Sequence, residues 1–91
     1  MALLVCDVEE GARPAEATVI LRDYQGRREF LPLDRGLITQ EAGKNWITVF
    51  VLHVDEATKT AFVGLPEEAD SGTHRIWVKK SQLRRIDEYV A

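Results

Sequence analysis

The chain is built from short runs of β-branched residues separated by clusters of Gly, Pro and Asp. Val, Ile and Thr number 9, 5 and 6, and together they make up 20 of the 91 residues. Branched side chains favour a pleated strand, whereas Gly, Pro and Asp favour turns that end it. This pattern predicts an all-β protein of six to seven short strands.

The length of 91 residues predicts a single domain over 1–91, because a second unit would be too small to bury its own core. Hydrophobic residues form 45% and charged residues 30% of the chain. This balance excludes collagen-like and wholly disordered proteins. A small bent antiparallel barrel is the expected architecture, since closing the sheet removes exposed edges.

The runs predict strands over 3–8, 18–23, 27–33, 46–54, 60–65 and 74–79. Asp23 and Gly26 occupy the first and fourth positions of a predicted type I turn with a left-handed bulge, which predicts a hairpin. Pro32 has no amide hydrogen, so the second arm of this hairpin is expected to end near it or to lie at a sheet edge.

Residues 34–45 contain Gly36 and Gly43 and are predicted to form a long loop, anchored in the core by Leu37 and Ile38. The following strand, 46–54, is apolar on both faces and is therefore expected to be central or bent. Strict alternation places Trp46, Phe50, Leu52 and Val54 on one face and Ile47, Val49 and Val51 on the other. His53 shares the second face and is expected to be a hydrogen-bonded structural histidine.

Alternation in residues 74–79 predicts that Ile76 and Val78 point into the core, while Trp77 points outward between Arg75 and Lys79. Two structures are compatible with the residues that follow. A helix capped by Ser81 would place Leu83, Ile86 and Val90 on one side. A single 3₁₀ turn that buries Leu83 before a last strand with Ile86 is preferred, because little length remains for a helix.

Residues 75–86 read Arg-Ile-Trp-Val-Lys-Lys-Ser-Gln-Leu-Arg-Arg-Ile. This stretch resembles the end of Src-homology-3-like barrels, where a strand runs into a 3₁₀ turn with a buried leucine and then a last strand. The resemblance implies a small bent barrel, a fold shared by peptide-binding modules and by the type II dihydrofolate reductases. Those reductases use a tetramer pore strand reading Val-Gln-Ile-Tyr, where this chain has Arg75-Ile76-Trp77-Val78.

The charge is unevenly distributed along the chain. Residues 1–70 carry 7 Lys or Arg and 13 Asp or Glu, a net charge of −6, whereas residues 71–91 carry 5 and 2, a net charge of +3. The overall charge of −3 argues against a generic nucleic-acid binder. The candidate binding residues combine an outward indole, the cations around it and a preceding acidic cluster; they are Trp77, Arg75, Lys79, Lys80, Arg84, His74, Glu67, Glu68 and Asp70.

The sequence has no pattern typical of a catalytic or metal site. Cys6 lies in a predicted buried strand, Ser71 and Ser81 lie in turns, and no short ligand spacing links Cys6 to His53 or His74. We therefore expect no enzyme activity, no metal and no cofactor. A single cysteine cannot form an internal disulfide, and the apolar start of the chain is too short to span a bilayer, so a cytoplasmic protein that does not bind membranes is expected.

The leading functional hypothesis is a binding module that engages a protein partner or its own copies through the Trp77 strand and the acidic cluster. An indole beside cations is also suited to bases and phosphates, so a nucleic-acid-binding barrel is one alternative. The other alternative is an oligomeric enzyme with a site between subunits, as the resemblance to the type II reductases implies.

Overall fold

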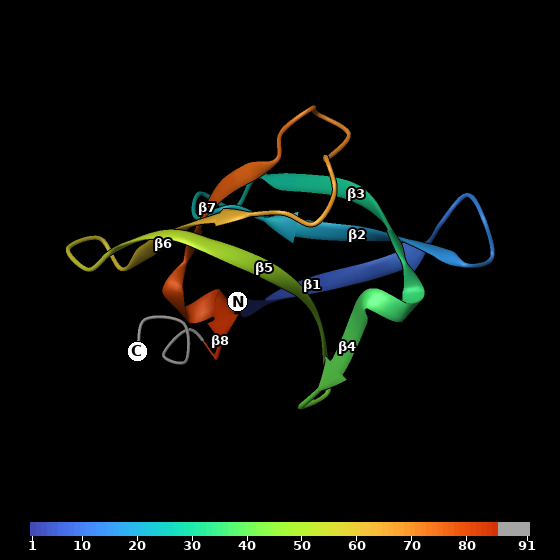
Figure 1. Ribbon diagram of the computed structural model, residues 1–91, viewed down its shortest axis with the longest axis horizontal. Helices are drawn as coiled ribbons and strands as arrows, with labels where there is room; N and C mark the ends of the chain where they lie inside the picture. Colours follow the sequence, from blue (N-terminus) through green and yellow to red (C-terminus); the bar gives the residue numbers. More distant parts are fainter. Residues whose placement is uncertain (86–91) are drawn as a thin grey trace.

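Eight antiparallel strands form one strongly curled sheet in the computed structural model, which describes residues 1–85 (Figure 1). The all-β prediction is confirmed. Along the sheet the order is β3-β2-β1-β5-β6-β7, with β4 pairing with β5 and β8 pairing with β1. The elements are β1 (Ala2–Glu10), β2 (Glu16–Arg22), β3 (Arg28–Asp34), the 3₁₀ turn η1 (Arg35–Leu37), β4 (Ile38–Glu41), β5 (Lys44–Asp55), β6 (Thr60–Gly64), β7 (Arg75–Lys79), the 3₁₀ turn η2 (Lys80–Gln82) and β8 (Leu83–Arg84).

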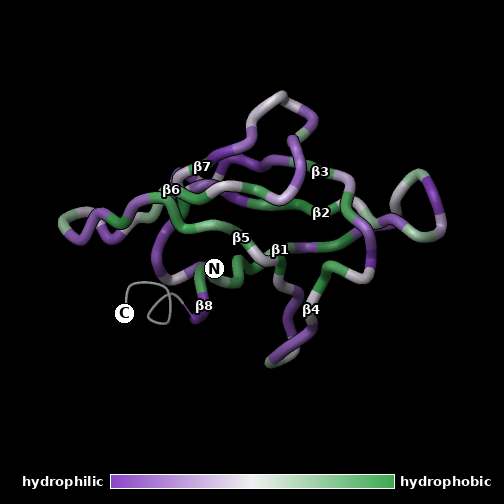
Figure 2. The backbone as a smooth tube through the Cα atoms, viewed as in Figure 1, coloured by the Kyte–Doolittle hydropathy of each residue, from purple (hydrophilic) through white to green (hydrophobic). Residues whose placement is uncertain are grey.

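The concave side of the curled sheet holds the hydrophobic core. Every second residue of the main strands points to this side, as the period of two in a strand requires. In Figure 2 the strands that line the core are largely green, whereas the connecting loops are largely purple. The largest fully buried side chains are Leu4, Leu21, Leu31, Ile47, Val19, Val49, Val51, Val63 and Val78.

The β2–β3 hairpin forms as predicted around Asp23 and Gly26. The backbone N–H of Gly26 donates to the carbonyl oxygen of Asp23 at 2.9 Å, and Gly26 has φ of 84°, a left-handed conformation that glycine adopts without steric cost. β3 is the first strand of the sheet order, so Pro32 lies on an edge strand, as its missing amide hydrogen predicted.

Backbone hydrogen bonds join the two ends of the sheet order. The N–H of Tyr24 donates to the carbonyl oxygen of Trp77 on β7 at 2.8 Å, and the N–H of Asp70 donates to the carbonyl oxygen of Phe30 on β3 at 2.7 Å. These contacts bring the β2–β3 hairpin against the last long strand. The sheet therefore has the curvature of a small barrel.

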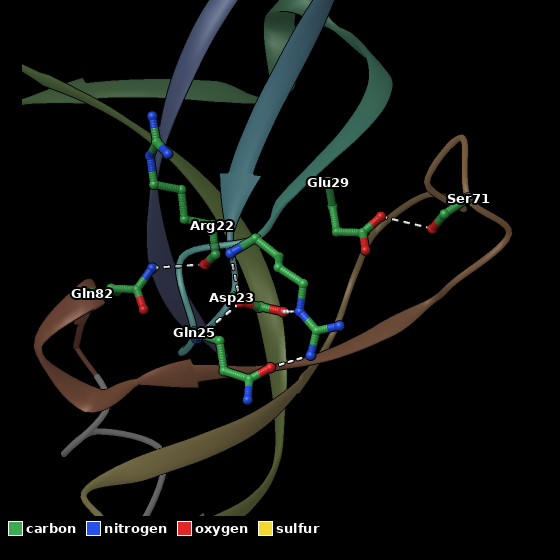
Figure 3. A network of polar contacts seen from close by, with 7 residues as sticks. Arg22, Asp23, Gln25, Glu29, Ser71 and Gln82 are labelled. Atoms are coloured by element: carbon green, nitrogen blue, oxygen red, sulfur yellow. Dashed lines mark hydrogen bonds and ion pairs between the residues drawn. The ribbon is translucent and has the colours of Figure 1, made fainter.

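Side chains add a second set of links across the same junction (Figure 3). The Ser71 hydroxyl donates to the Glu29 carboxylate at 2.7 Å, which ties the loop before β7 to β3. The amide nitrogen of Gln82 donates to the carbonyl oxygen of Arg22 at 2.9 Å, which ties η2 to the end of β2. Both ends of β7 are thus held to the β2–β3 hairpin.

The prediction of a long loop over 34–45 is wrong. Asp34 accepts a hydrogen bond from the N–H of Gly36 at 2.8 Å and starts η1, and β4 then pairs with β5 through a tight turn. In that turn Ala42 has φ of 53° and Gly43 φ of 73°, and two consecutive positive values are typical of a two-residue hairpin. Leu37 is 56% exposed and does not anchor the segment, whereas Ile38 packs against the core.

The preferred 3₁₀ turn near the C-terminus is confirmed, and the helix is not formed over the described residues. η2 occupies Lys80–Gln82, and the Gln82 side chain accepts a hydrogen bond from the N–H of Lys79 at 2.8 Å. Leu83 is buried, and β8 pairs with β1. The predicted last strand at Ile86 lies outside the described residues.

Candidate functional site

A row of three aromatic side chains crosses the outer face of the sheet. Strand register places His53 of β5 opposite Phe62 of β6, and Phe62 opposite Trp77 of β7. The Phe62 and Trp77 rings lie 5.0 Å apart between centroids with a 31° interplanar angle, and the His53 and Trp77 rings lie 6.1 Å apart, edge to face. Cross-strand aromatic contacts of this kind stabilise a sheet and hold the rings in place.

The outward orientation of Trp77 follows from its neighbours, as predicted. Ile76 and Val78 are buried in the core, whereas Arg75 and Lys79 are exposed and Trp77 is half-buried. Trp77 is half-buried because Phe62 and His53 lie beside it on the outer face. Its ring is therefore positioned by the sheet and still reaches solvent.

A β-bulge at Leu52 reverses the faces that were predicted for the last residues of β5. Val51 pairs with Val63 and His53 pairs with Phe62, so Leu52 is the unpaired residue. The bulge turns His53 to the outer face and Val54 toward the core, opposite to the sides that strict alternation predicted. His53 is exposed and its imidazole forms no hydrogen bond within residues 1–85, so the prediction of a hydrogen-bonded structural histidine is wrong.

Large apolar side chains extend the aromatic row along β5. Phe50 is 54% exposed and Leu52 is 49% exposed. We define the outer aromatic face as Phe50, Leu52, His53, Phe62 and Trp77. Trp46 belongs to the same side of β5 but is buried, with Arg84 5.0 Å above its ring.

The predicted basic cluster is only partly assembled around Trp77. Arg75 and Lys79 flank it on β7, and within residues 1–85 neither side chain forms an ion pair. Lys80 pairs with Glu56 at 2.7 Å. Arg84 pairs with Glu41 at 3.5 Å, beside β4 and away from the outer aromatic face.

The acidic residues Glu67, Glu68 and Asp70 occupy the exposed loop between β6 and β7. Glu68 lies 3.8 Å from the ring nitrogen of His74, so part of this loop faces a predicted binding residue within the same chain. Ala69 is buried and anchors the loop. The loop is held to β3 through the Asp70 N–H and faces the start of β7 through Glu68, and its acidic residues are not part of the outer aromatic face.

A cleft of about 280 Å³ opens at one end of the outer aromatic face. Tyr24 of the β2–β3 turn and Trp77 of β7 contribute its aromatic lining. Asp55, Thr58 and Thr60 of the β5–β6 hairpin contribute a carboxylate and two hydroxyls. The cleft therefore combines aromatic surface with a negative charge.

Cys6 is a poor nucleophile in this structure. It is buried on β1, and burial, with a smaller contribution from Asp7, raises the pKa of its thiol from 9.0 to about 11. Over residues 1–85, no three His, Cys, Asp or Glu side chains cluster as metal ligands would. The same part of the chain has no helix with the length and apolar character needed to cross a bilayer.

The fold and the site define a small protein with a curled β-sheet and an aromatic outer face. No family model, curated protein or solved structure matches this chain. The Src-homology-3-like resemblance accordingly remains a prediction.

Sequence reasoning identified Trp77 but missed most of the residues that surround it. Phe62 could have been found, because it alternates with the small buried residues Ala61 and Val63 and so must point outward. The contribution of Tyr24 had no signal in the sequence. It depends on the contact between the β2–β3 turn and β7, which are more than 50 residues apart.

Proposed function

We propose that this protein is a non-catalytic binding module that holds a protein partner against the outer aromatic face, in the cytoplasm. The observation that carries the proposal is the outward row of exposed His53 and half-buried Phe62 and Trp77, together with Phe50, 54% exposed, and Leu52, 49% exposed. Contiguous apolar surface of this kind is typical of interaction sites, and rigid aromatic side chains contribute much of the binding energy in protein interfaces.

Charge favours a protein partner with acidic groups over a nucleic acid. Arg75 and Lys79 flank Trp77 and form no ion pair within residues 1–85, so both can meet carboxylates of a partner. The other predicted cations offer less to phosphates. Lys80 is paired with Glu56 and Arg84 with Glu41, and the whole chain carries a net charge of −3.

Selection of a random peptide library displayed on phage against the purified protein tests the proposal. We expect enriched peptides that carry apolar or aromatic residues beside acidic ones. The variant Phe50→Ser should weaken the binding of a synthetic enriched peptide by at least about tenfold, because it removes an aromatic contact from the face. Leu37→Ser is the matched control, because Leu37 is 56% exposed on η1 and is not one of the residues of the outer aromatic face.

Three outcomes of the binding experiments would overturn the proposal, and a fourth outcome, self-association, would replace its occupant. The first is the absence of enriched peptides. The second is an enriched peptide that binds the Phe50→Ser and Leu37→Ser variants with equal affinity. The third is binding of single-stranded oligonucleotides that weakens steeply with salt and is lost in Phe50→Ser, which would assign the face to nucleic acid. Sedimentation of the parent protein and of the two variants detects self-association. A dimer that Phe50→Ser dissociates would identify a second copy, and not another protein, as the occupant.

A further inference from the structure

The cleft beside Trp77 has the size of one side chain. Its volume of about 280 Å³ lies just below the range usual for small-molecule sites, roughly 300–1,000 Å³. It lies between the β2–β3 turn, which supplies Tyr24, and the β5–β6 hairpin, which supplies Asp55. Because Trp77 belongs to both the cleft and the outer aromatic face, a partner on that face reaches the cleft directly.

Two aromatic residues line the cleft, and the fold holds both of them. The N–H of Tyr24 donates to the carbonyl oxygen of Trp77 at 2.8 Å, so the backbone fixes the two residues against each other. The Phe62 ring, 5.0 Å away, supports the indole from the side of β6. Tyr24 remains 43% exposed. The π faces of Trp and Tyr attract cations, most strongly where the cation is partly removed from water.

Asp55 adds a negative charge to this aromatic lining. Its Oδ1 accepts hydrogen bonds from the N–H groups of Ala57 at 3.0 Å and Thr58 at 3.3 Å, which hold the carboxylate in place at the turn. No Lys, Arg or His among residues 1–85 pairs with it. The hydroxyls of Thr58 and Thr60 bond to each other at 2.7 Å and carry no charge. The carboxylate is therefore available to a cation from outside the chain.

The nearby cations of the chain do not occupy the cleft. Lys79 is the next outward residue after Trp77, but it lines a neighbouring hollow with Gln25 and Ser81, which shares only Tyr24 with the cleft. Lys80 is held by Glu56 at 2.7 Å. Neither lysine lines the cleft of Trp77 and Asp55, and neither does Lys59, which lies between Thr58 and Thr60 in the chain.

We infer that this cleft receives a cationic side chain of the partner, an arginine or a lysine, with Asp55 as its counter-ion and Tyr24 and Trp77 as its aromatic walls. This inference rests on the proposed function, because it assigns a specific contact to the partner on the outer aromatic face. The recognised segment then carries a cation at one end and apolar and acidic groups along the rest of that face.

NMR titration with single amino-acid probes tests the cleft without any peptide. The probes are N-acetyl-arginine amide, N-acetyl-lysine amide and the neutral N-acetyl-norleucine amide. We expect the cationic probes to shift the indole N–H resonance of Trp77 with a Kd on the order of 1–10 mM, and the neutral probe to bind more weakly. The indole N–H of Trp46 donates to the carbonyl oxygen of Glu41 at 3.0 Å and serves as an internal reference that does not shift.

Two variants separate the charge of the cleft from its aromatic surface. Asp55→Asn keeps an oxygen that accepts the two turn hydrogen bonds but removes the charge, and should weaken the cationic probes by about fivefold. Trp77→Leu keeps an apolar side chain without a π face and should weaken binding by at least about tenfold, followed through backbone amide shifts. Asp34→Asn is the matched control, because Asp34 has the same turn-capping role at Gly36 outside the cleft.

The inference is overturned if norleucine amide binds as tightly as the cationic probes, or if Asp55→Asn binds them as tightly as Asp34→Asn. Its failure is distinguishable from failure of the proposed function. One result would remove only the cleft assignment: enriched peptides without a cation that bind Phe50→Ser more weakly, together with amino-acid amides that shift no resonance. Probes that bind the cleft while no peptide is enriched would remove only the protein-binding function.

Discussion

The bulge at Leu52 predicts that this residue can be deleted at small cost. Val51 and Val54 point toward the core on either side of Leu52 and His53, which both point outward. Removing Leu52 leaves a regular alternation of Val51 inward, His53 outward and Val54 inward. The pairing of His53 with Phe62 is then retained, and so is the aromatic row that ends at Trp77.

The expected change in the free energy of unfolding follows from the exposed fraction of the Leu52 side chain. Fully burying a leucine side chain contributes about 1.5–3 kcal/mol, and Leu52 is 49% exposed. The deletion should therefore lower the free energy of unfolding by about 1 kcal/mol. Loss of the bulge also removes one irregularity from the β5–β6 ladder, which offsets part of that cost.

Deletion of Phe62, on the strand opposite the bulge, is the contrasting control. β6 pairs with β5 on one side and with β7 on the other, so it cannot shift without breaking one ladder. A shift by one residue turns Val63 and Leu65, both buried, toward solvent. At about 1.5–3 kcal/mol for each side chain, the loss is about 3–6 kcal/mol, a large part of the stability of a small domain.

Urea unfolding monitored by tryptophan fluorescence and circular dichroism measures both deletions. The Leu52 deletion should give a cooperative transition close to that of the parent protein, whereas the Phe62 deletion should be largely unfolded. An unfolded Leu52 deletion would refute the assignment of the bulge. A Phe62 deletion as stable as the Leu52 deletion would refute the argument that pairing with both β5 and β7 determines which residues of β6 point inward.

Two further predictions concern β1 and the turn that follows it. Gly11→Ala should lower the free energy of unfolding by about 1–3 kcal/mol in urea titrations, because its Cβ would lie 2.7 Å from the carbonyl oxygen of Glu16; an unchanged midpoint would contradict this. The raised pKa of Cys6 means that the folded protein holds the thiol proton more tightly than the unfolded chain does. The stability from this group is complete below pH 9.0 and is lost as the pH rises to about 11, by up to about 3 kcal/mol. Cys6→Ala should lack this part of the pH dependence, and equal pH profiles for the two proteins would contradict the assignment.

Much of the strand pattern was predictable because it is local. The inward positions of Ile76 and Val78, and hence the outward position of Trp77, follow from a side-chain period of two. The β2–β3 turn followed from Asp23 and Gly26, whose conformational preferences act within four residues. β4 was missed because its turn uses Ala42 at φ of 53°, where glycine or asparagine is usual.

By itself, the sequence determined that this chain folds as a curled antiparallel sheet and that Trp77 lies on its outer surface. Only the tertiary structure decided what surrounds that side chain. The bulge at Leu52, the register of His53 with Phe62, and the contact of Tyr24 with Trp77 all depend on which strands become neighbours. Alternation along one strand determines on which face of the sheet a side chain lies. The side chains that lie next to it on that face depend on hydrogen-bond ladders between segments that are distant in the chain.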